Sequence, residues 1–394
     1  MKGNSENLLE QARELQERMV ELRRDFHRYP EGSFEEHRTA EKVEAELRRL
    51  GLEPVRIGGT GVMADIVGKP GGTIFALRAD MDALEVGEET GLDFASQREG
   101  YMHACGHDVH TAALLGAAML LVPRKEEFRG TLRLIFQPAE EKVAGAEVLI
   151  REGVLQGVAG IFGQHIWASL ESGALSIEPG PRMAGADGFT IHIRGKGGHA
   201  GLPHETVDAT VVTSAVVMAL QSLVSREMNP LDPVVVTVGE MHSGSRNNII
   251  SDKGIIRGTI RTFSEEVRRQ VPGALERIAV NTARAYRGEA EMEYEPGVSV
   301  TKNDPSMVTL ARESARKLFG EERFREVPPV GGAEDFARYL EQVPGAFAFF
   351  GGRSANPQAS SAHHHPKFDV DESRIWEMAA LHAQVGLDYL ECHQ

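Results

Sequence analysis

Length, composition and charge narrow the classes of protein that this chain can represent. A chain of 394 residues is longer than one hydrophobic core usually organises, so we expect two domains. Apolar residues make up 41% and charged residues 26% of the chain, as is typical of globular proteins. The 43 Lys and Arg against 58 Asp and Glu give a formal net charge of −15, which argues against nucleic acid or an anionic membrane as a partner.

Cysteine usage and the N-terminal segment indicate the compartment. The two cysteines, Cys105 and Cys392, are too few for the disulfide framework of a small secreted domain. The N-terminal segment is a charged amphipathic helix without the apolar centre of a signal peptide, and no apolar run is expected to approach membrane length. We therefore expect a cytoplasmic protein without a membrane segment.

The first third of the chain predicts helices followed by strands. Apolar residues at helical spacing predict helices, and runs rich in β-branched residues predict strands. The elements expected in this order are helices over 5–27 and 33–51 and strands over 61–67 and 73–77. Lys-Pro-Gly-Gly at 69–72 predicts a turn between the two strands. The second strand ends in Arg78-Ala79-Asp80-Met81-Asp82.

A Cys/His motif follows, in residues 101–108, before an apolar helix predicted over 109–122. Cys105 and His107 stand two residues apart, and both side chains are metal-ligand types. The same pair could equally be a nucleophile and its base. The motif alone leaves both interpretations open, so its neighbours must decide.

Two further strands end on residues that can do chemistry. A strand over 131–136 is followed by Gln137-Pro138-Ala139-Glu140-Glu141, and a strand over 160–162 by Gly163-Gln164-His165. In open α/β sheets, sites form outside the carboxyl ends of the strands. We therefore expect these ends to converge on one site.

The pattern changes near residue 186 and predicts a second domain. The expected elements are a strand over 189–194, a helix over 206–227, strands over 234–240 and 254–263, a helix over 265–286 and a strand over 289–294. This βαββαβ order is that of a ferredoxin-like unit, so we predict an inserted domain at 186–296. The first domain, 1–185 and 297–394, is then discontinuous; it resumes with a helix over 304–319, a strand over 346–350 and a last helix after Asp371.

One set of side chains in the first domain could hold metal ions. Its members are Cys105, His107, Glu141, His165 and one histidine of 363–365. Five N, O and S ligands suffice for two divalent ions, which together lower the pKa of a water molecule toward neutrality. Glu140, next to a ligand, can then act as general base.

Each member has a plainer interpretation when it is taken alone. A Glu pair at a strand end is usually a solvated edge, and His165 could be an ordinary polar residue of a strand end. His103 and His110 could be hydrogen-bonding neighbours of the motif, and three successive histidines often mark a loop. The joint pattern is much stronger than its parts.

The ordered motifs resemble those of a known family. They are residues 79–84 (ADMDAL), 102–108 (MHACGHD), 137–141 (QPAEE), 195–200 (GKGGHA), 258–263 (GTIRTF) and 364–368 (HHPKF). Together they resemble the aminoacylase and carboxypeptidase family of dinuclear metallopeptidases, over nearly the whole chain. The resemblance is to its amidohydrolase branch, which includes hippurate hydrolases, N-acetyl-amino-acid deacetylases and plant indole-acetyl-amino-acid hydrolases.

The resemblance implies a fold and roles for the residues of the first domain. The fold would be a zinc-exopeptidase-like α/β domain, a mixed sheet flanked by helices, with an inserted ferredoxin-like domain. Glu140 would be the base, and Asp82 would orient a ligand histidine, as imidazole ligands generally require. His364 is favoured over its neighbours because the family places this ligand two residues before the proline. The implied ligands are Cys105, His107, Glu141, His165 and His364.

The resemblance also assigns roles to residues of the inserted domain, which in the family usually dimerises and covers the site. His199 would contact the substrate carbonyl oxygen, in its own or a partner subunit, and Asn248 and Arg261 would bind the polar end of the substrate. Each has a plainer interpretation: an exposed imidazole in a glycine turn, an Asn that closes a turn, and a surface cation. The chain departs from the family pattern at Glu85 and Ser251, where the branch commonly has proline, which leaves substrate preference open.

We therefore expect metal-dependent hydrolysis of N-acyl amino acids, as small-molecule substrates, to a carboxylate and a free amino acid. The resemblance implies a homodimer or a dimer-based homo-oligomer through the inserted domain. A dipeptidase or carboxypeptidase with the same metal chemistry is the first alternative. A cysteine hydrolase built on Cys105 and a non-catalytic metal-binding protein are alternatives from other classes. The thiolate favours Zn, while mixed N and O ligands also admit Mn, Co or Ni.

Overall fold

The chain folds as two compact units. The structure is a computed structural model that describes residues 2–356 and 361–393. The first unit comprises Met1–Arg182, Lys302–Pro328 and Asp335–Gln394, and the second comprises Met183–Thr301 and Pro329–Glu334. The assignment of 1–185 with 297–394 and of 186–296 as a catalytic domain and an inserted dimerisation or lid domain stays a prediction.

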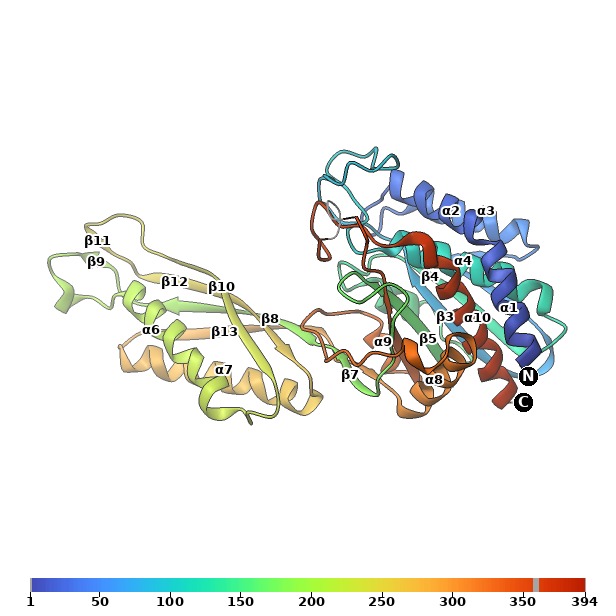
Figure 1. Cartoon of the computed structure of the whole chain (residues 1–394). Coiled ribbons are helices and arrows are strands. Elements are labelled where there is room, and N and C mark those ends of the chain that lie inside the picture. The colour runs from blue at the N-terminus through green and yellow to red at the C-terminus, as the bar shows by residue number, and fades with distance from the viewer. Residues whose placement is uncertain (1, 357–360, 394) are drawn as a thin grey trace. The chain divides into compact units, whose positions relative to one another are not determined.

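A seven-stranded mixed sheet forms the centre of the first unit (Figure 1). The four central strands, β4, β3, β5 and β15, are parallel to one another, while β1, β2 and β6 pair antiparallel. The predicted α/β fold with a mixed sheet is therefore confirmed. In sheet order, the strands are β1 Val55–Ile57, β2 Gly61–Val67, β4 Arg129–Gln137, β3 Lys69–Asp80, β5 Val158–Trp167, β15 Gly345–Gly351 and β6 Leu175–Ser176.

The chain reverses direction between β2 and β3, since β2 pairs antiparallel and β3 parallel with β4, but residues 69–72 are not a separate turn between two paired strands. These residues belong to β3, which pairs with β4, and β4 lies between β2 and β3 in the sheet. Gly71 and Gly72 have φ values of 90° and 85°, which glycine adopts readily. They allow the strand to bulge between Lys69 and Ile74, where the chain passes from one side of β4 to the other, so that β2 and β3 both pair with β4 and not with each other.

Helices pack against this sheet and against one another. α4 and α10 contact each other and β3, with α2 packed on α4 and α1 packed on α10. α4 is apolar on nearly all sides and is buried accordingly. The helix predicted over 5–27 instead begins at Lys2 and is interrupted at Leu15. The helices are α1 Lys2–Glu14, α2 Gln16–Arg28, α3 His37–Arg49, α4 His107–Leu121, α5 Gly145–Arg151, α8 Pro305–Phe319, α9 Ala337–Leu340 and α10 Ile375–Cys392.

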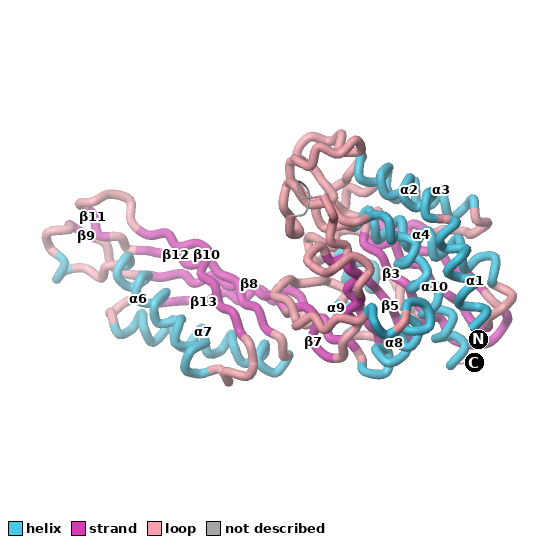
Figure 2. Tube along the Cα trace, in the orientation of Figure 1, coloured by secondary structure: helices cyan, strands magenta, loops and turns pink. Residues whose placement is uncertain are grey.

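The second unit contains a four-stranded antiparallel sheet in the order β10-β12-β8-β13. Two helices, α6 and α7, contact each other and this sheet, and Figure 2 shows them on one side of the strands. Along the chain the main elements follow the order βαββαβ. They are β8 Gly185–Arg194, α6 Ala209–Ser222, β10 Val234–Ser243, β12 Lys253–Thr262, α7 Glu265–Ala285 and β13 Glu289–Val298, with a small pair, β9 Gly198–His199 and β11 Ile249–Ile250.

One helical stretch corrects a statement made from the sequence. Residues 209–227, which include α6, are long and apolar enough to cross a membrane by length and composition alone. The expectation that no apolar run approaches that length is therefore wrong. Val212, Val216 and Leu220 of this stretch are buried in the apolar core of the second unit, so packing against the sheet accounts for part of its apolar character.

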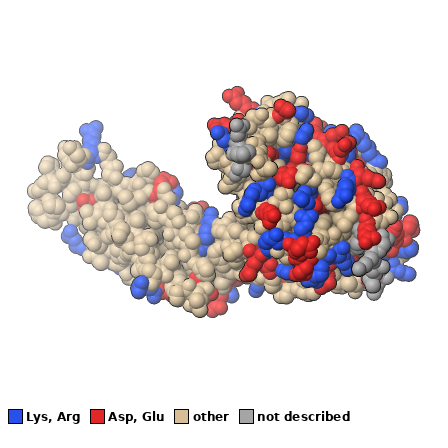
Figure 3. Space-filling model, in the orientation of Figure 1, with Lys and Arg blue, Asp and Glu red and all other residues tan. Residues whose placement is uncertain are grey.

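Charged side chains of both signs are interspersed over the face of the first unit that Figure 3 shows. Exposed ion pairs of this unit include Arg316 with Glu313 and Arg325 with Glu171. The excess of acidic residues is therefore spread over this face among basic ones.

Candidate metal centre

Polar side chains gather at the carboxyl ends of three neighbouring strands, as the sequence predicted. β3 ends at Asp80, Glu140 and Glu141 follow β4, and His165 lies near the end of β5. Because β4, β3 and β5 are parallel neighbours, their carboxyl ends meet at one edge of the sheet. Asp80, Glu140 and His165 are buried there.

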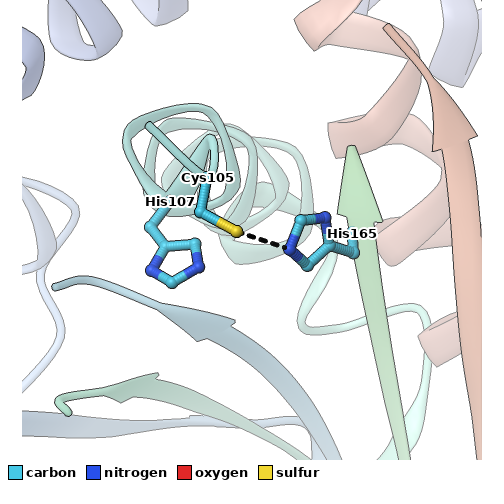
Figure 4. Close-up of side chains that lie close together, drawn as sticks. All are labelled: Cys105, His107 and His165. Atoms are coloured by element: carbon cyan, nitrogen blue, oxygen red, sulfur yellow. Dashed lines mark hydrogen bonds between the residues drawn. The ribbon is translucent and has the colours of Figure 1, made fainter. Parts of the chain in front are cut away.

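The Cys/His turn places its two side chains at the same edge. Gly106 has a φ of 92° and directly precedes α4, which begins at His107. A Cβ atom at Gly106 would lie 2.5 Å from Cγ2 of Ile166, so glycine permits the close approach of the turn to β5. As a result Cys105 Sγ lies 3.4 Å from His165 Nε2, and the imidazole of His107 points toward the same space (Figure 4).

Overlapping groups of ligand atoms link the five predicted ligands. Cys105, His107 and His165 form one group, and Cys105, Glu141 and His364 form another; within each, one donor atom per residue lies within 4.8 Å of the others. His364 Nε2 is 3.6 Å from Glu141 Oε2. The backbone N–H of His364 donates to the Ala104 carbonyl at 2.8 Å, which ties the 361–365 segment to the Cys/His turn.

Two buried atoms of this site face each other without hydrogen bonds. His107 Nδ1 donates to the Asp82 carbonyl at 2.9 Å, so Nε2 is the nitrogen that has a lone pair when the ring is neutral, as it is in a metal ligand. Nε2 of His107 and Oε1 of Glu141 are buried without a hydrogen-bond partner among the described residues, and they are 3.9 Å apart. Buried polar atoms are normally satisfied. A cation between these two Lewis bases would satisfy both, so the residues present fit a metal ion.

The pKa shifts of the site show an excess of buried negative charge. Burial opposes the charged form of His107, but Asp80, Asp82 and Glu141 outweigh it and raise its pKa to about 10. Burial raises the pKa of Glu141 to about 7, with the charge of His107 opposing and Asp82 adding to the shift. The carboxylates that raise the pKa of His107 would also favour a cation bound at its Nε2.

Asp82 holds the two consecutive glutamates. Its Oδ1 accepts from the backbone N–H of Glu140 and its Oδ2 from that of Glu141, both at 3.0 Å. Oδ2 also accepts from the Ser33 hydroxyl at 2.6 Å. Ala139, just before the pair, has a φ of 52°, which turns the chain at the end of β4. The side chain of Asp82 therefore orients Glu140 and Glu141, while its carbonyl orients His107.

Asp80, to which the sequence motifs assign no role, is central to a second buried cluster. Asp80 Oδ1 accepts from His110 Nδ1 at 2.5 Å, and Oδ2 accepts from Arg78 Nη1 at 2.6 Å. His110 is thus a hydrogen-bonding neighbour of the site, as one interpretation of the sequence held. Asp80 stands two residues before Asp82, on the same face of the chain where β3 ends, and that spacing is the signal that could have identified it.

A buried ion cluster supports the start of α4. Arg23 on α2 donates to Asp108 at 2.9 Å, to Asp369 at 3.0 Å and to Glu372 at 2.8 Å. His27 Nδ1 also lies 2.8 Å from Asp108. Arg23 and Asp108 are 85 residues apart in the chain, so no local pattern indicates that they meet. The cluster fixes the residue next to His107.

The three predicted residues of the second unit lie in two places within that unit. His199 is in β9, opposite Ile249 of β11, and the Asn248 carbonyl accepts from the N–H of Ala200 at 3.2 Å. His199 and Asn248 are therefore neighbours. Arg261 lies near the other end of β12, opposite Val235, and is half-buried. The structure brings His199 and Asn248 together and leaves Arg261 apart from them in the same unit.

Comparison with known proteins identifies the family. Residues 76–387 match the model of the peptidase family M20/M25/M40. The chain belongs to this family. The resemblance found in the sequence motifs is confirmed, and the chain is a metal-dependent hydrolase of the M20 family, whose matched segment contains every predicted site residue of both units.

Similar proteins carry the names of two hydrolase types. N-acetylcysteine deacetylase of Bacillus subtilis is 40% identical over 95% of this chain and 97% of its own length. Thermostable carboxypeptidase 1 of Saccharolobus solfataricus is 39% identical over 98% of both chains. The crystal structure of the Bacillus subtilis YXEP protein, described as a dinuclear metal-binding peptidase of the M20 family, is 36% identical over 96% of this chain and 99% of that chain, with a TM-score of 0.86. This M20 neighbour and the overlapping ligand groups support two metal ions in this chain.

Proposed function

We propose that this M20 hydrolase cleaves the amide bond of N-acyl amino acids to give a carboxylate and a free amino acid. The observation that carries the proposal is the facing pair of buried unsatisfied atoms, His107 Nε2 and Glu141 Oε1, beside the carboxylate of Glu140. The deacetylase that is 40% identical over 95% of this chain supports an acylated amino acid as the substrate.

The proposal assigns the metal site to five side chains. The two overlapping groups described above suit two divalent ions, and the thiolate favours zinc, with manganese, cobalt or nickel also compatible with N and O ligands. When bound, the ions would polarise the amide carbonyl and lower the pKa of a water molecule. The proposed ligands are Cys105, His107, Glu141, His165 and His364.

Glu140 is proposed as the general base. Its Oε2 lies 3.9 Å from His107 Nε2, and its backbone N–H is held by Asp82, so the carboxylate is fixed beside the ligand atoms. In this position it would take a proton from the attacking water and transfer it to the leaving nitrogen. A carboxylate fixed by the neighbouring turn loses little entropy on reaching the reactive geometry.

Residues of the second unit complete the proposal. His199 would donate to the developing oxyanion, in its own or a partner subunit, and Asn248 and Arg261 would bind the polar end of the substrate. The planar guanidinium of Arg261 suits a free carboxylate because it can donate to both oxygens. We further propose a homodimer formed through the second unit, and a cytoplasmic location.

Carboxypeptidase or dipeptidase activity is the alternative, which the carboxypeptidase at 39% identity supports. A hydrolysis screen separates the two: N-acetyl, N-benzoyl and indole-acetyl amino acids are compared with free dipeptides and N-blocked peptides. The metal-free full-length chain is reloaded with Zn, Mn, Co or Ni before each assay. Preference for free dipeptides or blocked peptides over N-acyl amino acids would contradict the proposal.

A Glu140→Gln variant tests the role of the base. It should keep the metal content of the wild type and lose about 10²- to 10⁴-fold in kcat, because only the proton-transferring group is removed. Glu141→Gln is the matched control: it removes a proposed ligand and should lower the metal content. Metal content is measured by elemental analysis beside kcat. Wild-type turnover in Glu140→Gln would exclude this role.

A further inference from the structure

Two of the histidines around Cys105 have lone pairs directed into the site. His107 Nδ1 is 2.9 Å from the Asp82 carbonyl oxygen, and His165 Nδ1 is 2.7 Å from the Ile166 carbonyl oxygen. A carbonyl oxygen only accepts, so Nδ1 carries the proton in each ring. Nε2 then has a lone pair, which is the arrangement a metal ligand requires.

Two other histidines have the same tautomer, but their Nε2 lone pairs accept from backbone N–H groups at the end of β5 and do not face the site. The N–H of Ile166 donates to His110 Nε2 at 2.8 Å, and the N–H of Ala168 donates to His363 Nε2 at 3.2 Å. A backbone N–H only donates, so Nε2 of each ring uses its lone pair there and Nδ1 carries the proton. Neither ring has Nε2 available for a metal ion.

The protonated nitrogens of these two rings face a carboxylate and a cysteine sulfur. His110 Nδ1 faces Asp80 Oδ1 at 2.5 Å, and His363 Nδ1 faces Cys105 Sγ at 3.9 Å. The ring of His363 is held by its neighbours: its centroid is 4.8 Å from that of Trp167 and 5.0 Å from that of Phe368. The direction of its N–H is therefore fixed by packing as well as by Ala168.

We propose that His363 is a positioning residue that donates its Nδ1–H to the thiolate of Cys105 and is not itself a metal ligand. The inference rests on the proposed function, in which Cys105 is a ligand. A hydrogen bond to a thiolate stabilises the charged sulfur and lowers its electron density. His363 would thus keep Cys105 in the ligand form and weaken the thiolate as a nucleophile.

The test uses the cobalt-loaded full-length chain and its near-ultraviolet thiolate-to-cobalt absorption band. His363→Phe keeps a ring between Trp167 and Phe368 but removes the donor, and should move the band to lower energy. It should also lower the metal affinity about 10-fold, the lower end for partners of metal ligands, because the 3.9 Å contact is long. His363→Asn retains an N–H donor near the position of Nδ1 and should return the band toward the wild-type energy.

A neighbouring exposed histidine gives the matched control. His365→Asn should leave both the band and the affinity unchanged, because His365 is exposed and its Nδ1 accepts from the N–H of Lys367. An unmoved band in His363→Phe would overturn the inference, as would loss of an entire metal ion in both His363 variants, the result expected of a ligand. Absence of the band from the wild type would instead remove Cys105 from the ligand set, and so contradict the proposed function itself.

Discussion

An Asp82→Ala variant should loosen the turn that carries Glu140 and Glu141 without breaking the hydrogen bond that orients His107. That bond is made to the backbone carbonyl of residue 82, which Ala retains. The lost carboxylate accepts the N–H groups of Glu140 and Glu141 at 3.0 Å and the hydroxyl of Ser33 at 2.6 Å. The variant therefore removes the support of the glutamates and keeps the carbonyl bond to His107, but it also removes the carboxylate oxygen that lies 3.4 Å from His107 Nδ1.

The expected magnitude follows from these bonds. Asp82 is 1% exposed, and a hydrogen bond to a buried charged group contributes about 1.5–3 kcal/mol. If each backbone N–H loses one such bond, opening of the turn becomes easier by about that free energy. Since about 1.4 kcal/mol corresponds to a tenfold change, amide hydrogen exchange at Glu140 and Glu141 should accelerate about 10- to 100-fold.

Hydrogen exchange of the metal-free protein, followed by mass spectrometry on peptides that span residues 137–144, measures this effect. Asp93→Ala removes an exposed carboxylate of the same unit and should leave exchange in these peptides unchanged. Metal affinity of Asp82→Ala should fall as well, because Glu141 is held less firmly. Wild-type exchange at Glu140 and Glu141 in Asp82→Ala would refute the assignment of the carboxylate as their support.

Two further predictions concern buried ion pairs of the two units. Arg23→Met leaves Asp108 buried without its main partner, so the free energy of unfolding of the first unit should fall by about 3–5 kcal/mol. Urea unfolding, monitored by tryptophan fluorescence, measures this loss. In the second unit, burial alone would raise the pKa of Asp187, but bonds from Arg268 and the Gly297 N–H lower it below its ordinary value. The stability that Asp187 contributes is then present above an unfolded-state pKa of about 3.9 and is lost as the pH falls through its lower folded-state pKa. Hydrogen exchange of β8 should therefore be faster in Asp187→Asn than in the wild type at pH 7, and the two should differ little in strong acid.

The convergence of the site was predictable because it depends on a general property of parallel strands. Asp80, Glu140 and His165 each stand at or just after the end of a strand, and the carboxyl ends of parallel neighbours meet at one edge. The pairing of residue types with strand ends was therefore visible in the sequence. The order of the strands was not, because the position of β4 between β2 and β3 depends on pairings between distant segments.

The supporting contacts could not be predicted, because they join segments that local patterns do not relate. His363 receives the N–H of Ala168, 195 residues away, and Arg23 reaches Asp108 across 85 residues. Which nitrogen of an imidazole bears the proton follows from such contacts alone. The sequence could therefore name a set of candidate ligands, whereas sorting His363 from His364 by its hydrogen bonds required the structure.

The contact between Cys105 and His165 also bears on the cysteine-hydrolase alternative, since Sγ and Nε2 are 3.4 Å apart. In a catalytic pair the imidazole must take the thiol proton, yet burial lowers the pKa of His165 well below its ordinary value. With its Nδ1–H donated to the Ile166 carbonyl, His165 directs a lone pair at the sulfur. The Cys105 thiol can donate its proton to this lone pair, and a metal ion can take the place of that proton between the sulfur and the nitrogen. The facing atoms of His107 and Glu141 offer a second such position, so the geometry can accommodate cations at two neighbouring positions.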